Sequence, residues 1–293
     1  KLLSKNDRII IFGRNGQLGS TYNQYLSGFS NILQLSSKEL NFLNTNNITR
    51  VIREFKPKYV INTSAYTNVK EAEKNFDIAN EINCNAVQVL AETCKKHNSV
   101  LIHYSTDYVF DGEKVTRYNT SDLPNPKNFY GQSKLNGEKK IIESGCDFFI
   151  FRISWLVSEY GNNFIKTILS ELKKETNLFI VNDQIGSPIS SNLVTEITTK
   201  VILDDIKTKQ IFHLSTHGKV SWYDIAIYIS KIAKNINKNL KLIPIKSHEY
   251  TSETFRPKNS LFDLSEIEKI LKKQMPFWQD DIKPIIKNLD FNS

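Results

Sequence analysis

Tyr130 and Lys134 lie four positions apart in a segment predicted to be helical. Four residues of α-helix rise about 6 Å and return to nearly the same face, so both side chains point into one cleft. A free phenol has a pKa near 10 and is a slow acid at neutral pH. An ammonium at about 4 Å, with an effective dielectric constant of about 20, supplies about 4 kcal/mol, which lowers such a pKa by about three units. The spacing therefore predicts a tyrosine proton donor whose pKa is lowered by Lys134.

Two hydroxyl side chains, Ser105 and Thr106, follow an apolar, β-prone run at residues 100–104, which predicts a buried strand. The Thr106 hydroxyl is expected to bind the same substrate oxygen that Tyr130 protonates. A Tyr–Lys pair at this spacing is by itself more often a solvated helix face. The strand-end hydroxyls and the glycine motif described next favour the catalytic interpretation.

Three glycines, Gly13, Gly16 and Gly19, follow a strand predicted at residues 8–12 and overlap the start of a helix predicted at 17–26. A strand, a glycine turn and a helix N-terminus form the layout that binds a pyrophosphate. The spacing G-x-x-G-x-x-G differs from the usual G-x-G-x-x-G of dinucleotide-binding proteins. The glycines could serve a tight turn alone, but their place after the first strand favours a dinucleotide cofactor.

The end of the second predicted strand, at residues 32–35, bears on the type of cofactor. NAD-preferring sites commonly carry an acid there for the ribose 2′-hydroxyl, whereas this strand ends in Ser36-Ser37-Lys38. Arg14 lies in the glycine loop and Lys38 just beyond the strand. The pattern predicts that a 2′-phosphate is tolerated or preferred, and hence NADPH, with NADH as the alternative.

The remaining pattern alternates strands and helices, which predicts an α/β fold. Residues 63–67 follow the third strand, at the end where ligands bind in open α/β sheets. His97 is expected at a helix C-terminus and His103 inside a strand as a buried, hydrogen-bonded residue. Further strands are predicted at 58–62, 148–153, 178–181 and 210–214. Further helices are predicted at 46–55, 77–97, 161–174, 191–203, 222–234, 265–273 (with a capping box of Ser265 and Glu268) and 280–289.

The chain has 293 residues, 40% hydrophobic and 24% charged, which is typical of a soluble globular protein. No run approaches the ~18 apolar residues that cross a membrane, so no membrane contact is expected. The net charge of +8 comes from scattered lysines and does not favour nucleic-acid binding. Three cysteines without a C-x-x-C pair, and no histidine pair with ligand spacing, predict neither a disulfide scaffold nor a metal site. A reducing cytoplasm fits this usage.

Eight motifs, in this order, resemble those of the dTDP-4-dehydrorhamnose reductase family within the extended short-chain dehydrogenase/reductase superfamily. They are GRNGQLG at 13–19, INTSAYTNVKEAE at 61–73, HYSTDYVFDG at 103–112, NFYGQSKLNGEK at 128–139, FRISW at 151–155, GNNF at 161–164, NDQIGSP at 182–188 and RPKNS at 256–260. Their combination is far more specific than any single motif, and they are spread over nearly the whole chain.

The resemblance implies a Rossmann doubly wound parallel sheet at residues 1–155, which binds NAD(P)H. A smaller, discontinuous C-terminal part at 156–293 would mainly bind a nucleotide sugar, with some segments returning to the first unit. The implied reaction is reduction of the 4-keto group of dTDP-4-dehydro-6-deoxy-L-mannose (dTDP-4-dehydrorhamnose) to dTDP-L-rhamnose, for cell-surface polysaccharide synthesis.

The resemblance also implies roles for individual residues. The catalytic residues are Thr106, Tyr130 and Lys134, with Tyr130 as the proton donor. The cofactor-binding residues are Gly13, Arg14, Asn15, Gly16, Gln17, Leu18, Ser36, Asn41, Phe42, Ser64, Ala65, Tyr66, Thr67, Tyr104, Tyr130 and Lys134. The substrate-binding residues are Thr106, Asp107, Trp155, Asn163, Asp183, Gln184 and Arg256.

Departures from the family pattern limit what carries over. Thr21 and Asn192 stand where some members carry glutamates of a magnesium-bridged dimer, so no metal is expected, and the chain would be a monomer or a homodimer. Asn41 stands where many members have an acid near the adenine. Two alternatives remain open: a reductase of another NDP-4-keto-6-deoxysugar, or a non-catalytic regulatory subunit resembling the β subunit of methionine adenosyltransferase.

Overall fold

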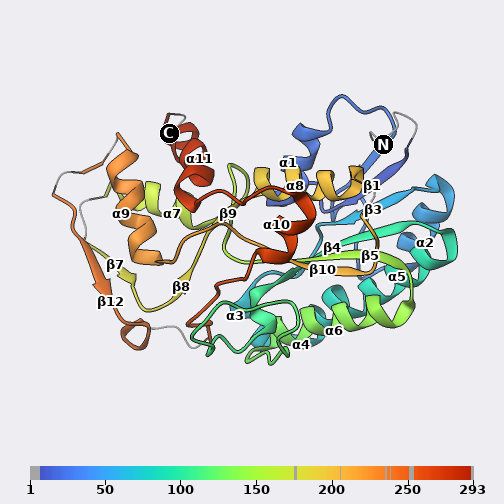
Figure 1. Cartoon of the computed structure of the whole chain (residues 1–293), viewed down its shortest axis with the longest axis horizontal. Coiled ribbons are helices and arrows are strands. Elements are labelled where there is room, and N and C mark those ends of the chain that lie inside the picture. The colour runs from blue at the N-terminus through green and yellow to red at the C-terminus, as the bar shows by residue number, and fades with distance from the viewer. Residues whose placement is uncertain are drawn as a thin grey trace.

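The central sheet organises the chain in a computed structural model that describes residues 7–174, 177–204, 206–234, 236–237, 239–250 and 254–291. Within these residues, six parallel strands pair in the order β10-β5-β4-β3-β1-β2 (Figure 1). All four residues of β1 are buried, as expected for a parallel strand whose two faces are both covered. The strands are β1 (Ile9–Phe12), β2 (Ile32–Leu35), β3 (Tyr59–Asn62), β4 (Val100–Thr106), β5 (Asp147–Ile153) and β10 (Gln210–Leu214).

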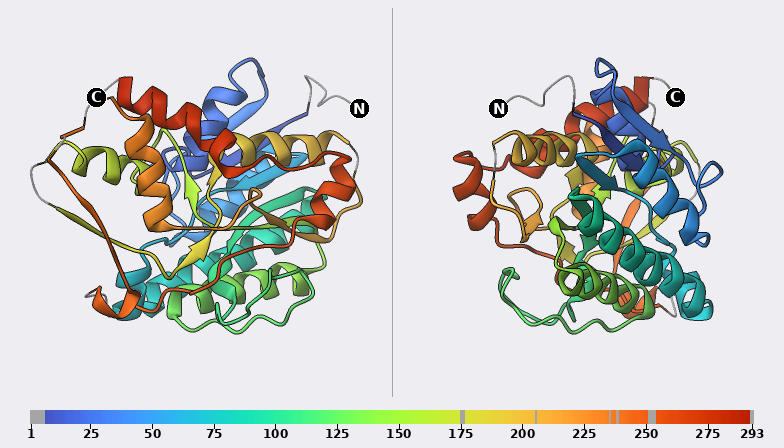
Figure 2. Two further views of the ribbon diagram at one scale, coloured as in Figure 1. Left: turned by 60° about the vertical axis from the view of Figure 1, so that its left-hand side comes forward. Right: turned by 90° about the vertical axis from the view of Figure 1, so that its right-hand side faces the viewer.

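Helices cover both faces of this sheet (Figure 2). On one face, Ile52 of α2, Leu90 of α5 and Ile141 of α6 join a buried cluster with the strands. On the other face, α1, α8 and α10 pack through a second cluster that includes Tyr22 and Ile197. The prediction of a doubly wound Rossmann sheet is confirmed. These helices are α1 (Gln17–Tyr25), α2 (Thr45–Phe55), α5 (Ala86–His97), α6 (Phe129–Ser144), α8 (Ser191–Leu203) and α10 (Ser265–Leu271).

The strand order reverses direction between β1 and β3, because β1 pairs with β2 on one side and with β3 on the other. At such a point the connections after the two strands leave in opposite directions, and the carboxyl ends of the strands open a crevice. The glycine turn after β1 and residues 63–67 after β3 therefore lie at the same edge of the sheet. This is the edge at which the predicted site residues gather.

The C-terminal part builds a further core beside the sheet. Buried Ile165, Ile225 and Ile282 pack three helices together there, next to a parallel two-stranded pair of β7 and β12. Three segments from beyond residue 155, β10, α8 and α10, belong to the sheet layers instead. The division of the chain into two units at residue 155 stays a prediction. Residues 1–6 of the first unit and 292–293 of the second lie outside the described residues. The elements are α7 (Phe164–Glu171), β7 (Leu178–Val181), α9 (Trp222–Ile232), β12 (Leu242–Ile245) and α11 (Trp278–Phe291).

Short elements connect these layers. Among the described residues, no helix is both long and apolar enough to cross a membrane. The connecting elements are α3 (Val69–Lys74), α4 (Phe76–Asn80), η1 (Glu81–Asn85), η2 (Asp107–Val109), β6 (Leu156–Val157), β8 (Ile185–Gly186), β9 (Ile189–Ser190), β11 (Val220–Ser221) and η3 (Ser247–Glu249).

The helix predicted at 77–97 is interrupted by one wide turn. Its middle, η1, is a π-helix that lies between α4 and α5. The extra residue in this turn rotates the helix faces on either side relative to each other. Ile78, placed by periodicity on the apolar face, is consequently 44% exposed, whereas Ala79 is buried.

The capping box predicted for Ser265 and Glu268 is wrong. Helix α10 begins after Leu264, and the backbone N–H of Ser265 donates to Asp263 instead. The Glu268 carboxylate turns away from the helix N-terminus, because its Oε1 accepts hydrogen bonds from Met275 N at 2.8 Å and from His217 Nε2 at 2.6 Å. A local sequence signature could not reveal these partners.

Candidate active site

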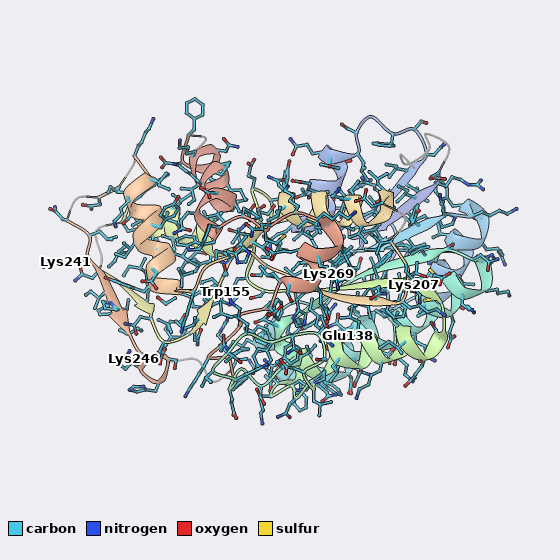
Figure 3. All side chains as sticks on the ribbon, in the orientation of Figure 1. Glu138, Trp155, Lys207, Lys241, Lys246 and Lys269 are labelled. Atoms are coloured by element: carbon cyan, nitrogen blue, oxygen red, sulfur yellow. The ribbon has the colours of Figure 1, made fainter. Side chains whose placement is uncertain are left out.

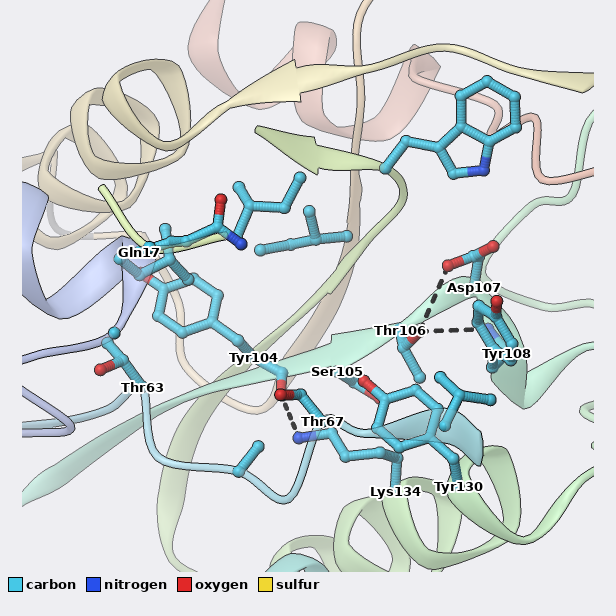
Figure 4. Close-up of a pocket in the computed structure, with 18 of the residues that line it drawn as sticks. Gln17, Thr63, Thr67, Tyr104, Ser105, Thr106, Asp107, Tyr108, Tyr130 and Lys134 are labelled. Atoms are coloured by element: carbon cyan, nitrogen blue, oxygen red, sulfur yellow. Dashed lines mark hydrogen bonds between the residues drawn. The ribbon is translucent and has the colours of Figure 1, made fainter. Parts of the chain in front are cut away.

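A cleft of about 590 Å³ opens at the carboxyl ends of the central strands (Figure 4). It is lined by the glycine turn after β1, the segment after β3, the end of β4 and the first turns of α6. Many of the predicted site residues meet here although they come from distant parts of the chain. They are Gly16, Gln17, Leu18, Ser64, Ala65, Thr67, Tyr104, Thr106, Asp107, Tyr130, Lys134, Trp155 and Arg256.

Tyr130 is held against Thr106 by the way α6 begins. The Asn128 side chain caps this helix, accepting a hydrogen bond of 2.8 Å from Gly131 N. A Cβ on Gly131 would lie 2.1 Å from the carbonyl oxygen of Tyr108, so only glycine lets α6 approach η2 this closely. The Tyr108 and Tyr130 rings then meet edge to face, with centroids 5.5 Å apart.

Thr106 ends β4 and anchors the next turn. Its hydroxyl accepts a hydrogen bond of 3.2 Å from Tyr108 N and donates one of 3.2 Å to Asp107 Oδ1. It also lies beside the Tyr130 phenol, whose pKa it lowers. The predicted meeting of these two hydroxyl groups in one cleft is therefore present in the structure.

Burial raises the pKa of Tyr130 above its ordinary value, with the hydrogen bond to Thr106 as the largest opposing influence. The Nζ of Lys134 donates to the carbonyl oxygen of Tyr104 at 2.6 Å (Figure 4). A buried ammonium needs an acceptor, and the strand backbone supplies one. That Lys134 lowers the pKa of Tyr130 stays a prediction.

Asp107 carries a buried carboxyl group beside the same hydroxyls. Burial raises the pKa of Asp107 to about 6, and hydrogen bonding by Ser260 is the largest opposing influence. The guanidinium of Arg256 lies near, with Nη1 3.5 Å from the Tyr108 hydroxyl. Arg256 and Ser260 come from the segment before α10, so the end of the chain completes this side of the cleft.

The glycine turn fits a pyrophosphate. Gly13 has φ of +92°, and a Cβ on Gly19 would lie 2.0 Å from the Gly13 carbonyl oxygen, so the turn needs glycine at both positions. Helix α1 begins after Gly16 with no side-chain cap, which leaves its first amide groups available to an anion. Within the described structure the buried hydroxyl of Ser105, at the cleft wall, has no hydrogen-bond partner. These residues are suited to a dinucleotide.

A second cavity of about 220 Å³ adjoins the glycine turn on the side of the predicted adenine site. Gly13, Asn15, Asn41 and Phe42 line it, and Gly16, Ser64 and Ala65 line both cavities. Phe42 is buried and packs edge to face on Phe12, with centroids 5.4 Å apart. The two cavities together bring most of the predicted cofactor residues to one edge of the sheet.

Arg14, one of the two cations predicted to receive a 2′-phosphate, already binds an acid. Glu39 Oε2 accepts hydrogen bonds from Ser36 N at 2.8 Å and Ser36 Oγ at 2.7 Å, and lies 3.0 Å from Arg14 Nη2. These contacts, led by the Ser36 amide, lower the pKa of Glu39. The inference that no carboxylate acts at the end of β2 is wrong, because the turn at 36–39 folds Glu39 back onto the strand end.

Besides Arg14 and Ser36, four predicted site residues line neither cavity. Tyr66 is fixed through its backbone N–H, which donates 2.8 Å to Asn83 Oδ1. Asn163 caps α7, and its Nδ2 lies 3.3 Å from Gln17 Oε1. Asp183 accepts hydrogen bonds from Ser247 N and Oγ. Gln184 accepts one of 3.2 Å from Trp222 Nε1.

Trp155 lies between the sheet and the C-terminal part (Figure 3). It has φ of 53°, a strained conformation for a bulky residue. Its indole stacks on Trp222, with centroids 3.7 Å apart, and lies so close to Gly186 that a Cβ there would be 2.6 Å from the ring. The aromatic wall of the cleft is thus a pair of tryptophans rather than one.

Sequence reasoning did not assign site roles to several residues of the cleft. Trp222 begins α9 directly after β11, outside every motif, and only tertiary structure brings it to Trp155. Tyr108 lies within the motif HYSTDYVFDG at 103–112, which is the signal that could have identified it. The unassigned lining residues are Asn62, Thr63, Val69, Ser105, Tyr108, Ile153, Leu156, Gly161, Asn162 and Trp222.

Comparison with known proteins agrees with this geometry. A family model described as the RmlD substrate binding domain matches residues 7–291. The chain is 37% identical over 287 residues to the dTDP-4-dehydrorhamnose reductase of Aggregatibacter actinomycetemcomitans, a match that covers 95% of this chain and 98% of that protein.

Solved structures show the same relationship. The crystal structure of dTDP-4-dehydrorhamnose reductase from Bacillus anthracis, in complex with NADP, has a TM-score of 0.89 at 31% identity and covers 98% of this chain and 99% of its own. The structure of the protein of that name from Clostridium acetobutylicum has a TM-score of 0.90 at 31% identity, over 96% and 99%. The chain therefore belongs to the dTDP-4-dehydrorhamnose reductase family.

Proposed function

We propose that this protein reduces the 4-keto group of dTDP-4-dehydrorhamnose to give dTDP-L-rhamnose, with NADPH as the cofactor and NADH as the alternative. The observation that carries the proposal is the single cleft in which Thr106, Tyr130 and Lys134 lie beside the glycine turn. The Bacillus anthracis relative, whose structure holds NADP, supports the choice of cofactor.

When bound, the reduced nicotinamide supplies a hydride to the carbonyl carbon of the sugar. The glycine turn and the N-terminus of α1 would hold the pyrophosphate, and Ser105 and Lys134 would face the ribose next to the nicotinamide. Gly13, Asn15, Asn41 and Phe42 would line the adenine site. These assignments follow from the position of each group along the cleft.

Tyr130 would donate its proton to the carbonyl oxygen as negative charge develops there. A reductase needs this phenol protonated at the start of each turnover, and its raised pKa ensures that. The Thr106 hydroxyl, which lies in the same cleft, would hold the same oxygen. A positively charged Lys134 would stabilise the phenolate that the proton transfer leaves behind.

Asp107, Arg256 and Trp155 would orient the sugar, because they line the cleft on the side away from the glycine turn. Asn163, Asp183 and Gln184 would support the walls of that site. We place the reaction in the cytoplasm, which suits the free, buried thiols of Cys84, Cys94 and Cys146. The chain would work as a monomer or homodimer in the synthesis of cell-surface polysaccharide.

An NADPH-oxidation assay against a panel of dTDP-, GDP- and UDP-linked 4-keto-6-deoxysugars tests the proposal. We expect turnover of dTDP-4-dehydrorhamnose above all other members. Faster turnover of a different sugar would establish the alternative substrate. Cofactor binding without turnover of any sugar would contradict the enzymatic role and leave the regulatory-subunit alternative.

A further inference from the structure

A buried line of polar groups leads away from the cleft, beneath Lys134. It consists of Asn62 at the end of β3, His103 in β4 and Lys134 in α6, which are at most 2% exposed. Asn62 Nδ2 lies 3.1 Å from His103 Nδ1, and His103 Nε2 lies 3.4 Å from Lys134 Nζ. The proposed mechanism uses Lys134 alone and leaves the other two residues without a role.

The contacts of Asn62 determine which nitrogen of His103 carries the proton. Asn62 Oδ1 accepts a hydrogen bond of 3.0 Å from Ser64 N, so the amide cannot be turned around without losing that bond. Its NH₂ group therefore faces His103 Nδ1. Since an NH₂ group only donates, Nδ1 must be the acceptor, and the hydrogen of a neutral ring lies on Nε2. Burial, together with the charge of Lys134, lowers the pKa of His103 well below its ordinary value, so the ring is neutral.

The N–H of this tautomer points at Lys134. An ammonium has three donors and no lone pair, so it cannot accept the imidazole N–H, whereas a neutral amine can. The only acceptor that contacts Lys134 Nζ among the described residues is the Tyr104 carbonyl. Asn62 and His103 therefore oppose the charged form of the lysine.

We propose that Asn62 and His103 are positioning residues which, by fixing an imidazole N–H toward Lys134, favour its neutral amine and make its charge vary across the working pH range of the enzyme.

The other groups around Lys134 agree with this assignment. Glu138, one turn further along α6, favours the charged lysine, but its carboxylate is engaged by Arg152 of β5 at 2.7 Å. From η1, the side chain of Asn83 offers an uncharged amide that donates to Ser133. Burial is the largest influence and lowers the pKa of Lys134 to about 8.

The consequence for catalysis rests on the proposed function. Only the charged lysine stabilises the Tyr130 phenolate, so kcat should fall as the pH rises through the pKa of Lys134. In an enzyme with an ordinary lysine this fall would begin about two units higher. Asn62 and His103 would thus set the alkaline limit of activity without touching the substrate.

Two NMR measurements test the proposal without relying on activity. First, ¹⁵N shifts of the wild-type histidines, with His103 assigned by its loss in His103→Phe or His103→Gln, report the tautomer directly. We expect an acceptor Nδ1 and a protonated Nε2. A ring protonated on Nδ1, or an imidazolium at neutral pH, would overturn the proposal.

Second, the pH titration of the Lys134 ε-carbon, assigned by its loss in Lys134→Met, reports the charge of the lysine. We expect a midpoint near 8 in the wild type and a midpoint at least half a unit higher in His103→Phe. Asn62→Asp should raise it by about one unit, because a carboxylate would draw the proton to Nδ1 and leave the Nε2 lone pair facing the lysine.

The double variant separates this effect from the added negative charge. If His103 transmits the effect, Asn62→Asp should raise the midpoint no further once His103 is Phe. An equal rise in both backgrounds, or midpoints unchanged from the wild type, would overturn the proposal. His97→Phe, which removes an imidazole at the end of α5, is the matched control and should leave the midpoint unchanged. Absence of turnover with every sugar would contradict the proposed function but not these titrations.

Discussion

The side chains of Asp107 and Ser260, 153 positions apart, share a hydrogen bond of 2.5 Å between Oδ2 and Oγ. This bond joins the turn after β4 to the segment that carries Arg256. The Asp107 carboxyl group is buried, and Ser260 Oγ is its donor from the C-terminal part. The protonation state of the Asp107 carboxyl group therefore bears on the contact between the turn after β4 and the segment that carries Arg256.

The stability of the protein should depend on the protonation of Asp107. Burial raises the pKa of Asp107 to about 6 from its ordinary 3.8, so between these values the folded chain holds a proton that the unfolded chain releases. The contribution of this group to stability is therefore largest below about pH 4 and falls as the pH rises through 6. Urea unfolding at several pH values should show the wild type losing on the order of 2–3 kcal/mol relative to Asp107→Asn between pH 4 and 7.

The control is Asp77→Asn, which changes an exposed carboxylate of α4. Its stability difference from the wild type should stay constant over the same range. A constant difference for Asp107→Asn as well would show that the folded and unfolded chains bind the Asp107 proton equally.

Tyr130→Phe should reduce kcat by about 10²–10⁴, because it removes the proton donor and leaves the ring in place. The dissociation constant of NADPH should change little, since the phenol acts on the sugar oxygen. Steady-state kinetics and a fluorescence titration with NADPH measure the two quantities. The control is Tyr228→Phe, which removes a hydroxyl outside the cleft that donates to Gln279 O at 3.3 Å. Its kcat and its dissociation constant for NADPH should equal those of the wild type. Turnover like that of the wild type in Tyr130→Phe would remove this residue from the mechanism.

Gly131→Ala should damage both stability and activity. The added Cβ would lie 2.1 Å from the Tyr108 carbonyl oxygen, which must move or push α6 away. We expect a loss of about 1–3 kcal/mol in the free energy of unfolding, typical of an overpacked contact. Because Tyr130 is the adjacent residue, kcat should fall more steeply than KM rises. Gly28→Ala adds a methyl group with nothing within 4 Å and should leave both measurements unchanged.

Glu39 should compete with the 2′-phosphate of NADPH. Its carboxylate already binds Ser36 and Arg14, the groups suited to that phosphate, and its negative charge would repel the phosphate. Glu39→Gln should therefore raise kcat/KM for NADPH about fivefold, because it removes a competing negative charge at an exposed site, and should not raise that for NADH.

Arg14→Ala should lower kcat/KM for NADPH, by up to about tenfold, and affect NADH less. Glu54→Gln, an exposed change on α2, is the control. Equal responses of the two cofactors to both substitutions would show that neither Arg14 nor Glu39 contacts the 2′ position.

The sequence by itself determined the sheet strands, most of the helices and the catalytic spacing. Apolar β-prone runs such as 9–12 and 100–104 can be buried in few other ways, and the order of strands and helices leads to a parallel sheet. The separation of Tyr130 from Lys134 is a property of one helix, so local geometry was enough to place both on one face. The glycines after β1 likewise act within a single turn.

Only the tertiary structure decided what these groups touch. Lys134 Nζ donates to the backbone carbonyl of Tyr104 in β4 and not to the Tyr130 phenol. The neighbouring His103, also in β4, is oriented by Asn62 of β3. Glu39 folds back onto Ser36 through a turn. The residue types in this turn do not reveal its conformation. The wide turn at η1 rotates the face of a helix without leaving a periodic signal. Hydrogen-bond partners are chosen by distances across the packed fold, and sequence spacing constrains those distances only within one element.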